Sequence, residues 1–281
     1  IGSADPTGMS TITKNIGSVS NRGIEFAADV DIIRNNDWNW NVGLNLTWLK
    51  NEIIELPDGK DILNGLQTFS EGHSIYQFYT YQYAGVDQMN GRAVYVADPE
   101  QIEKAKQEGY YVNINGKDYT YNTTYGLKDW SGSALPNVYG SISTSVKYKG
   151  VTLSILGTYS LGGKTYDSTY AALMSSGVAS PSALHKDVLN AWQGVPEGMT
   201  ETSPNRIDPN GIPRFDLSSE DAYSQGAGTR WLQNSSYFVL KNINLNYEFP
   251  KRWVTTMGLS GLSVYGSIEN AFTITSLKGM N

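Results

Sequence analysis

The sequence contains no cysteine, no long apolar run and no cluster of basic residues. Without cysteine the chain has no disulfide, no thiol nucleophile and no zinc–thiolate site. No stretch has the roughly 20 apolar residues that a membrane-spanning helix needs. The net charge of −6 and the lack of a basic run argue against nucleic-acid binding. A mean hydropathy of −0.36 does not exclude membrane-spanning strands, because alternation of polar and apolar residues dilutes their apolar signal.

A regular alternation of apolar and polar residues runs from Ile24 to Trp48. The apolar positions are Ile24, Phe26, Ala28, Val30 and Ile32, then Trp38, Trp40, Val42, Leu44, Leu46 and Trp48. The polar run at positions 34–37 lies between the two sets and predicts the turn of a hairpin. Strands of soluble sandwiches also alternate, but they run about 5–6 residues. These run roughly twice as long, which predicts a transmembrane β-hairpin.

Two more hairpins are predicted by the same alternation, at residues 138–161 and 237–274. The apolar set of the first is Val138, Gly140, Ile142, Thr144, Val146, Tyr148, Val151, Leu153, Ile155, Gly157, Tyr159 and Leu161. That of the second is Tyr237, Val239, Ile243, Leu245, Tyr247, Phe249, Leu262, Val264, Gly266, Ile268, Phe272 and Ile274. Lys241 interrupts this face, which is costly at mid-bilayer but tolerable near a rim or against a partner. Residues 162–234 lack sustained alternation, and so long an irregular connection is typical of one rim of an outer-membrane barrel.

Aromatic residues make up 12% of the chain, with 19 Tyr and 7 Trp. Such side chains favour membrane interfaces, and they also stack on sugars. If the short turns share one side of a membrane, two aromatic girdles are predicted. The girdle near the turns is Trp38, Trp40, Tyr148 and Phe249, and the girdle about one bilayer width away is Trp48, Tyr159 and Tyr237. The alternative is that these rings are ordinary sheet residues.

The remaining segments predict loops and short elements. Residues 75–83 are aromatic on both faces, which predicts either a strand lining a lumen or a strand packed on both sides. Short helices are expected at 102–108 and at 183–192, and residues 1–12 are expected to form a loop. The acidic turn at 87–91 resembles a calcium loop only loosely, because no bidentate Glu follows at the required spacing. We therefore predict no cofactor; calcium in the loops or in a partner stays open as an alternative, but these residues do not indicate it.

No catalytic constellation or metal site is predicted. His73 and His185 are the only histidines, and neither has nearby partners at metal-ligand spacing. The acidic residues Asp167, Glu220 and Asp221 are expected to be solvated loop acids. With no acid–base pair and no activated nucleophile, the sequence predicts a protein that is not an enzyme.

Several segments resemble the SusC/RagA family of TonB-dependent outer-membrane transporters. They are NIGSVSNRGIEF at 15–26, WNWNVGLNLTWLKNEIIEL at 38–56, FYTYQYAGVDQMNGRAVYV at 78–96, LPNVYGSISTSVKYKGVTLSILGTYSLGGKTYDSTY at 135–170, RWLQNSSYFVLKNINLNYEFP at 230–250 and LSVYGSIENAFTIT at 262–275. They keep the family's order and cover over half of the chain. The resemblance implies an all-β fold, the C-terminal part of a 22-stranded antiparallel transmembrane β-barrel with long extracellular loops. Residues 1–281 would be a partial barrel that supplies about seven to nine strands, without the plug, the TonB box or the last strand.

The resemblance implies TonB-dependent import of a nutrient across the outer membrane of a Bacteroidetes-like bacterium. The expected partners are TonB through the missing N-terminal part, a SusD-like surface lipoprotein, the remainder of the barrel and outer-membrane lipid. An oligosaccharide is the expected substrate, because aromatic platforms with polar neighbours suit sugars. Candidate contacts are Trp130, Tyr166, Tyr170, Trp192 and Trp231; the alternative is that they pack loops together or against a partner. A peptide importer of the same family, a passive porin or adhesin barrel, and a soluble sugar-binding sandwich stay open as alternatives.

Overall fold

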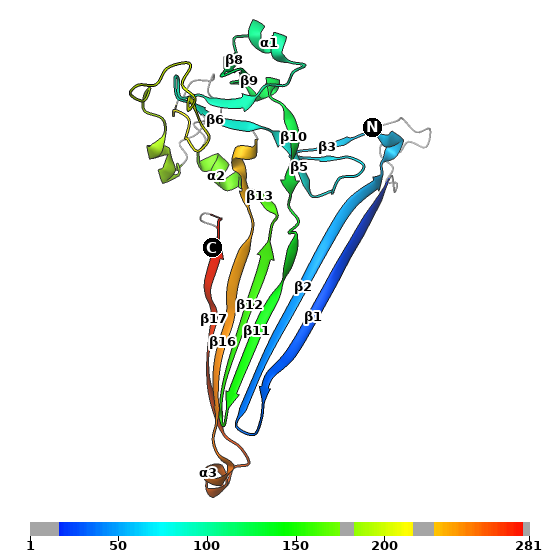
Figure 1. Ribbon diagram of the computed structural model, residues 1–281, viewed down its shortest axis with the longest axis vertical. Coiled ribbons are helices and arrows are strands. Elements are labelled where there is room, and N and C mark those ends of the chain that lie inside the picture. Colours follow the sequence, from blue (N-terminus) through cyan, green and yellow to red (C-terminus); the bar gives the residue numbers. More distant parts are fainter. Residues whose placement is uncertain (1–16, 175–182, 216–227, 278–281) are drawn as a thin grey trace, which may run out of the picture.

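The computed structural model describes residues 17–174, 183–215 and 228–277. Within them, one antiparallel sheet of six long strands has the order β1-β2-β11-β12-β16-β17 (Figure 1). Its strands are β1 Ser18–Arg34, β2 Trp38–Glu55, β11 Val138–Tyr148, β12 Val151–Leu161, β16 Tyr237–Glu248 and β17 Ser263–Thr275. All three predicted hairpins are present. The described residues supply six strands to this sheet, against the seven to nine expected, and residues 77–87 belong to smaller sheets.

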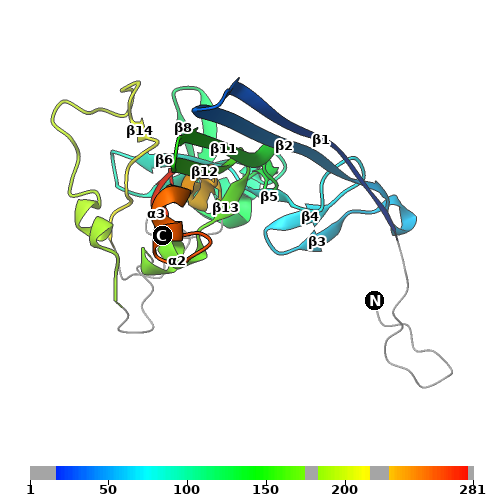
Figure 2. The same cartoon turned by 90° about the horizontal axis from the view of Figure 1, so that it is seen from below.

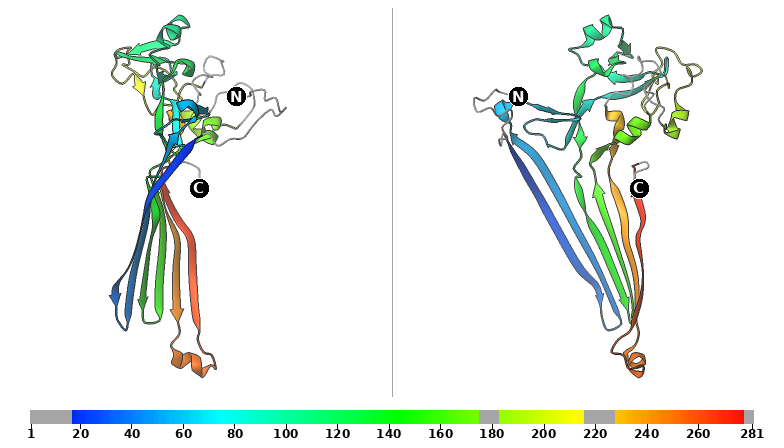
Figure 3. Two further views of the ribbon diagram at one scale, coloured as in Figure 1. Left: turned by 90° about the vertical axis from the view of Figure 1, so that its right-hand side faces the viewer. Right: turned by 180° about the vertical axis from the view of Figure 1, so that it is seen from behind.

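The connections of the long sheet divide sharply between its two ends. The turn after β1, the turn after β11 and the segment with helix α3 (Lys251–Thr256) lie together at the lower end of Figure 1. Asn35 closes the first turn, where its side-chain oxygen accepts from the amides of Asp37 and Trp38 at 3.0 and 2.8 Å. The other connections lie at the opposite end, as both views in Figure 3 show. This is the predicted asymmetry of short turns and long loops.

One face of the long sheet is apolar and remains exposed. The register pairs Ile24 with Trp48 and Phe26 with Leu46, so the apolar positions of neighbouring strands lie side by side. The same alignment continues from β2 through β11 to β12. Ile24 is 63% exposed and Ile268 is 57% exposed. A continuous apolar surface of this kind needs an apolar environment or a partner.

The opposite face of the sheet is polar and is joined by cross-strand hydrogen bonds. The Asn41 amide nitrogen donates to Asp29 at 2.6 Å, and the Asn45 amide nitrogen donates to Ser141 at 2.6 Å. Ser145 and Ser154 are 3.2 Å apart across the next pair of strands. The two faces therefore have the different environments that the alternation predicts.

A β-bulge in β16 corrects the predicted face of Tyr237 and Val239. The register of β16 shifts between Leu240 and Asn242, against both β12 and β17. Tyr237 therefore pairs with Ser160 of the polar face, while Phe238 pairs with Tyr159 of the apolar face. A bulge inserts one extra residue and reverses the side-chain alternation beyond it. Of the predicted upper girdle, Trp48 and Tyr159 lie on the apolar face, and Tyr237 does not.

Lys241 is the extra residue of this bulge. Its ammonium donates to the side-chain oxygen of Asn270 at 3.2 Å on β17. Asn270 has a φ of 48° and lies on β17 between Glu269 and Phe272, where the register with β16 is interrupted at the same point. The charge that interrupts the apolar alternation in the sequence is thus accommodated by paired departures from regular strand geometry.

Short elements form the loop end of the molecule. The strands are β3 Ile62–Asn64, β4 Gln67–Phe69, β5 Gln77–Tyr81, β6 Tyr83–Asp87, β7 Ala93–Val96, β8 Tyr111–Ile114, β9 Lys117–Thr120, β10 Lys128–Ser133, β13 Lys164–Tyr166, β14 Ile207–Asp208 and β15 Leu232–Asn234. In the described ranges the helices here are α1 Ile102–Gln107 and α2 Ser168–Leu173, and the 3-10 turns are η1 Pro57–Gly59, η2 Thr123–Tyr125, η3 Lys186–Asn190 and η5 Thr229–Trp231. Seen from below, the β3–β4 hairpin and the segment with β14 project to opposite sides (Figure 2).

The best-buried residues belong to this loop end. Val86, Val94 and Tyr95 are fully buried in the sheet β14-β6-β7-β9-β8. In the neighbouring sheet Phe78 and Thr80 are buried on one face of β5, while Gln77, Tyr79 and Tyr81 on the other face are partly exposed, so both alternatives for the segment at 75–83 stay open. The helix predicted at 102–108 is present as α1. The one predicted at 183–192 is only the 3-10 turn Lys186–Asn190, and the loop predicted at 1–12 lies outside the described residues.

Among the described residues, no helix combines the length and the apolar character that crossing a membrane would require.

Candidate substrate-binding site

Two of the five candidate aromatic residues, Tyr170 and Trp231, meet in a pocket at the loop end. The pocket has a volume of about 320 Å³, and its lining includes Tyr83, Tyr170, Asn210, Ile212, Arg230 and Trp231. The rings of Tyr170 and Trp231 lie edge to face, with centroids 5.8 Å apart. Pockets of this size are at the small end of the range for ligand sites.

Asp167 positions both rings. Its carboxylate accepts from the Tyr170 amide at 2.8 Å, so it caps α2, and its own amide donates to the Trp231 carbonyl at 2.9 Å. Gln233 donates to its second carboxylate oxygen at 3.0 Å. Asp167 is only 3% exposed, which corrects the expectation of a solvated acid. The contacts join α2 to the segment η5–β15 and hold the wall of the pocket.

Tyr170 is held at its hydroxyl end as well. The hydroxyl donates to Asp187 at 2.9 Å, and the ring lies edge to face against His185. Burial, and then this bond to a carboxylate, raise the pKa of Tyr170 to about 12. The phenol is therefore neutral at physiological pH, and its ring is presented in a fixed orientation.

Arg230 and Tyr83 also line the pocket, although neither was a candidate from the sequence. The guanidinium carbon of Arg230 lies 4.3 Å from the Trp231 ring centroid and 5.6 Å from that of Tyr83. The amide of Tyr83 donates to the Thr229 hydroxyl at 3.0 Å, which ties β6 to η5. Burial raises the pKa of Tyr83 to about 12. Arg230 stands directly before Trp231 in the sequence, but nothing in the sequence places Tyr83 beside it.

The other three candidates lie around the pocket or apart from it. Tyr166 pairs with Leu232 in the β13–β15 ladder, next to Trp231. The Trp192 indole donates to the Gln88 carbonyl at 3.1 Å, and its ring packs on Gly91. Trp130 stacks on His73 with centroids 3.6 Å apart, in the sheet that contains β5 and β10. Trp130 and Trp192 thus make the loop-packing contacts that were the alternative, and a substrate role for the five residues stays a prediction.

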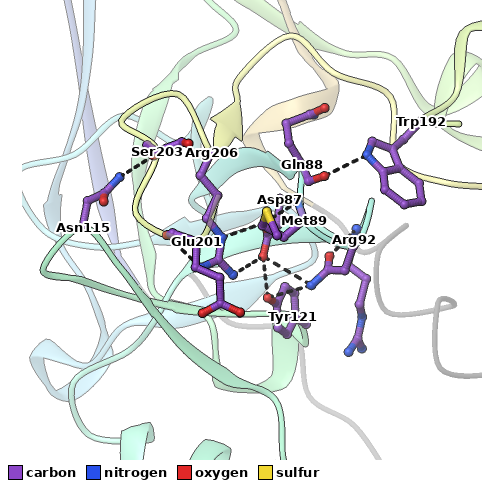
Figure 4. Close-up of polar contacts among 11 residues, drawn as sticks. Asp87, Gln88, Met89, Arg92, Asn115, Tyr121, Trp192, Glu201, Ser203 and Arg206 are labelled. Atoms are coloured by element: carbon purple, nitrogen blue, oxygen red, sulfur yellow. Dashed lines mark hydrogen bonds and ion pairs between the residues drawn. The ribbon is translucent and has the colours of Figure 1, made fainter. Parts of the chain in front are cut away.

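A buried ion pair anchors the loop that supplies part of the pocket. The Arg206 guanidinium donates to both oxygens of Asp87, at 2.9 and 2.8 Å, and Tyr121 donates to one of them at 2.7 Å (Figure 4). Asp87 is fully buried and the Arg206 side chain is 8% exposed. Burial alone would raise the pKa of Asp87, but the bonds from Arg206, Tyr121 and the Met89 amide, with the Arg206 charge, hold it below its usual value. We call Asp87, Tyr121 and Arg206 the loop clamp.

The loop clamp also accounts for the acidic turn that loosely resembles a calcium loop. Both Asp87 oxygens are engaged by protein donors. No group of three or more His, Cys, Asp or Glu side chains that could hold a metal was found in the part of the chain that the structure describes. The turn is therefore organised by an ion pair within the chain.

The aromatic girdle candidates can be placed on the long sheet. Trp38 and Tyr148 are register partners near the short turns, with ring centroids 4.3 Å apart, and Phe249 packs on Tyr247 at 4.8 Å. Trp48 lies ten residues further along β2. Ten residues of strand span roughly 33 Å, or about 25 Å along the membrane normal at a tilt of about 40°. That separation matches the apolar band of an outer-membrane barrel, and the interface role stays a prediction.

These features define a class of protein. Long antiparallel strands with an exposed apolar face, a hydrogen-bonded polar face, short turns at one end and folded loops at the other form a segment of a transmembrane β-barrel.

Comparisons with known proteins identify the kind of barrel. No family model matches the chain. TonB-dependent receptor P3 of Formosa agariphila is 26% identical over 287 residues, which cover 97% of this chain and 26% of the relative. TonB-dependent receptor SusC of Bacteroides thetaiotaomicron is 26% identical over 288 residues, covering 96% of this chain and 24% of the relative. The chain thus spans about a quarter of the length of these relatives.

Solved structures give the same fold. A structure of the RagAB peptide transporter aligns with a TM-score of 0.74 at 24% identity, covering 97% of this chain and 28% of that one. Its "open-open" state aligns with a TM-score of 0.72. The predicted resemblance to SusC/RagA TonB-dependent receptors, the barrel fold and the bacterial outer-membrane location are thereby confirmed. The relatives are receptors and transporters, in agreement with the prediction of a non-enzyme.

Proposed function

We propose that the protein to which residues 1–281 belong imports an oligosaccharide across the outer membrane, with energy supplied through TonB. The observation that carries this proposal is the partly exposed ring of Tyr170, which lines a pocket at the loop end of a barrel sheet beside the buried Trp231. Aromatic faces beside polar groups suit the alternating apolar and hydroxylated faces of sugars. The similarity to TonB-dependent receptors supports the coupling to TonB. No step of this function is catalytic.

The proposed partners follow from the surfaces that the chain leaves exposed. In the described residues β1 and β17 are the edges of the long sheet, and open edges are not stable in a bilayer. The remaining strands of the same barrel, including the last strand, would therefore pair with them. Outer-membrane lipid would cover the apolar face between the girdles. A SusD-like lipoprotein would cover the folded loops as a lid.

A peptide is the second candidate substrate. The observation that favours it is the similarity to structures described as a peptide transporter and peptide importer. Loop backbone and polar side chains around the pocket can serve a peptide as well as a sugar. The two candidates share the barrel, the energy source and the lipoprotein, so they differ only in what the loop end binds.

The test is purification of the tagged full-length protein from outer membranes, followed by identification of the proteins that co-purify. A stoichiometric surface lipoprotein is expected, and calorimetry with oligosaccharides and peptides then separates the two substrates. The matched control is ion conductance in a planar bilayer, where a plugged importer conducts almost nothing. An isolated barrel that conducts constitutively would contradict the proposal and indicate a porin.

A further inference from the structure

In the part of the chain that the structure describes, the guanidinium of Arg230 forms no ion pair with a carboxylate. Its Nη1 atom is buried without a hydrogen-bond partner. The contacts found for this side chain are with the rings of Trp231 and Tyr83. A buried donor that lacks a partner is destabilising, and a charged one more so. By contrast Arg206, in the neighbouring loop, is fully paired with Asp87.

A second unpaired donor lies in the same pocket. The hydroxyl of Tyr83 is buried and has no hydrogen-bond partner. With a pKa of about 12 it keeps its proton at physiological pH, so it can donate to an acceptor. Arg230 and Tyr83 both line the pocket, and the guanidinium carbon of Arg230 lies 5.6 Å from the centroid of the Tyr83 ring. Two donors without a partner, one of them charged, thus belong to neighbouring residues of the pocket wall.

Other polar groups of the pocket are already engaged. The Thr229 hydroxyl accepts from the Tyr83 amide, and the Tyr170 hydroxyl donates to Asp187. The Asn210 backbone amide donates to the Asp208 carboxylate at 2.9 Å. The buried groups of the pocket that lack a partner are therefore donors, and one of them carries a positive charge. Such a set fits an acceptor that carries negative charge.

We propose that this pocket binds a carboxylate of the transported substrate, held by the Arg230 fork and the Tyr83 hydroxyl. The guanidinium matches the two oxygens of a planar carboxylate, and its position against two aromatic rings fixes the direction of the fork. A volume of about 320 Å³ admits a single sugar ring or the end of a peptide rather than a long chain. The carboxylate belongs either to an acidic sugar or to a peptide terminus. This inference rests on the proposed import function and narrows its substrate class.

The test is calorimetry on the full-length protein with its co-purified partners, using matched pairs of probes. One pair is an oligogalacturonate and its methyl ester, and the other is a short peptide with a free and with an amidated C-terminus. The wild type is expected to bind one acid at least tenfold more tightly than its neutral form. Because a hydrogen bond to a charged group contributes roughly ten- to hundredfold, R230M should reduce that ratio to about one. Y83F should reduce it by a few-fold.

The matched control is K128M. Lys128 also lies over a tyrosine ring, that of Tyr81 at 4.8 Å, but outside the pocket. K128M should leave the ratio unchanged. R230K retains the positive charge but loses the two parallel donors of the guanidinium. If R230K is folded and keeps part of the preference for the acidic over the neutral probe, the effect of R230M is a loss of carboxylate recognition and not a general loss of structure.

The outcomes are distinct for the two proposals. A preference for the oligogalacturonate or for the peptide acid supports the carboxylate site and identifies its source. Equal binding of acid and neutral probes by the wild type, no binding of either acid, or an unchanged ratio in R230M overturns the site. The import proposal is tested by a separate measurement, and substrate uptake that does not depend on TonB would contradict it.

Discussion

The loop clamp should determine how firmly the segment containing β14 is held on the loop sheet. In R206M the Asp87 carboxylate stays buried and loses the cation that holds it. Removing one partner of a buried pair costs about 3–5 kcal/mol. Protonation of Asp87 limits this cost to about 4 kcal/mol at pH 7, because roughly three pKa units separate pH 7 from the usual Asp value. We expect R206M to destabilise the segment by about 3–4 kcal/mol.

Hydrogen exchange measured by mass spectrometry on the full-length protein reports this change. The Gln88 amide donates to the Arg206 carbonyl and the Arg214 amide donates to the Gly91 carbonyl, both at 2.8 Å. These amides become exposed when the segment opens, and about 3 kcal/mol corresponds to exchange that is more than a hundredfold faster. Amides of β11 and β12 should exchange as in the wild type.

The control variant is K147Q. It removes an ion pair of 3.2 Å between Lys147 and Glu248, which is exposed on both sides. Exposed ion pairs contribute at most about 1 kcal/mol to stability. In K147Q the exchange rate of the Gln88 and Arg214 amides should therefore rise less than about fivefold. If R206M accelerates exchange no more than K147Q does, the loop clamp does not hold the segment and the reasoning is refuted.

Three further predictions concern pH, the bulge and a close strand contact. Folding lowers the pKa of Asp87, so the stability that its carboxylate contributes is complete above the usual Asp pKa of about 4 and is lost as the pH falls through the pKa of the folded state. Protection of the Gln88 amide from exchange should therefore be constant from pH 8 to 5 and fall below pH 4. The D87N variant should lack this acid dependence. A spin label at F238C should be accessible to oxygen and one at Y237C to a water-soluble nickel complex, and the reverse pattern would contradict the bulge register. A Cβ at Gly140 would meet the Asn45 carbonyl oxygen, whereas none of the described atoms lies within 4 Å of a Cβ at Gly266. G140A should therefore lower the free energy of unfolding, measured by thermal unfolding, by about 1–3 kcal/mol, and G266A should lower it much less. Equal losses of stability in the two variants would show that the contact is unimportant.

The long sheet could be predicted because its signal is local. Strict alternation over more than ten residues determines which side chains share a face, and polar turns determine the hairpins. The bulge at Lys241 could not be predicted in the same way. It depends on Asn270 in a neighbouring strand, whose left-handed conformation allows the second irregularity.

The pocket was predictable only in part. Tyr170 and Trp231 were candidates because aromatic residues stand out in a polar connection, and the structure brings them together. Tyr83 and Arg230 are far apart in the sequence and meet because the Tyr83 amide bonds to Thr229 and Tyr81 forms a β-bridge with Gly228. Asp167 was misjudged for the same reason, since its burial depends on Trp231 and Gln233 from the far side of a long connection.

The central claim is that the protein imports its substrate with energy supplied through TonB. The most direct measurement is uptake of a labelled oligosaccharide by cells that express the full-length protein, with and without a functional TonB. The account predicts saturable uptake that requires both the protein and TonB, with a peptide of similar size as the comparison substrate. Uptake that persists at the same rate without TonB would contradict the account and indicate a passive channel.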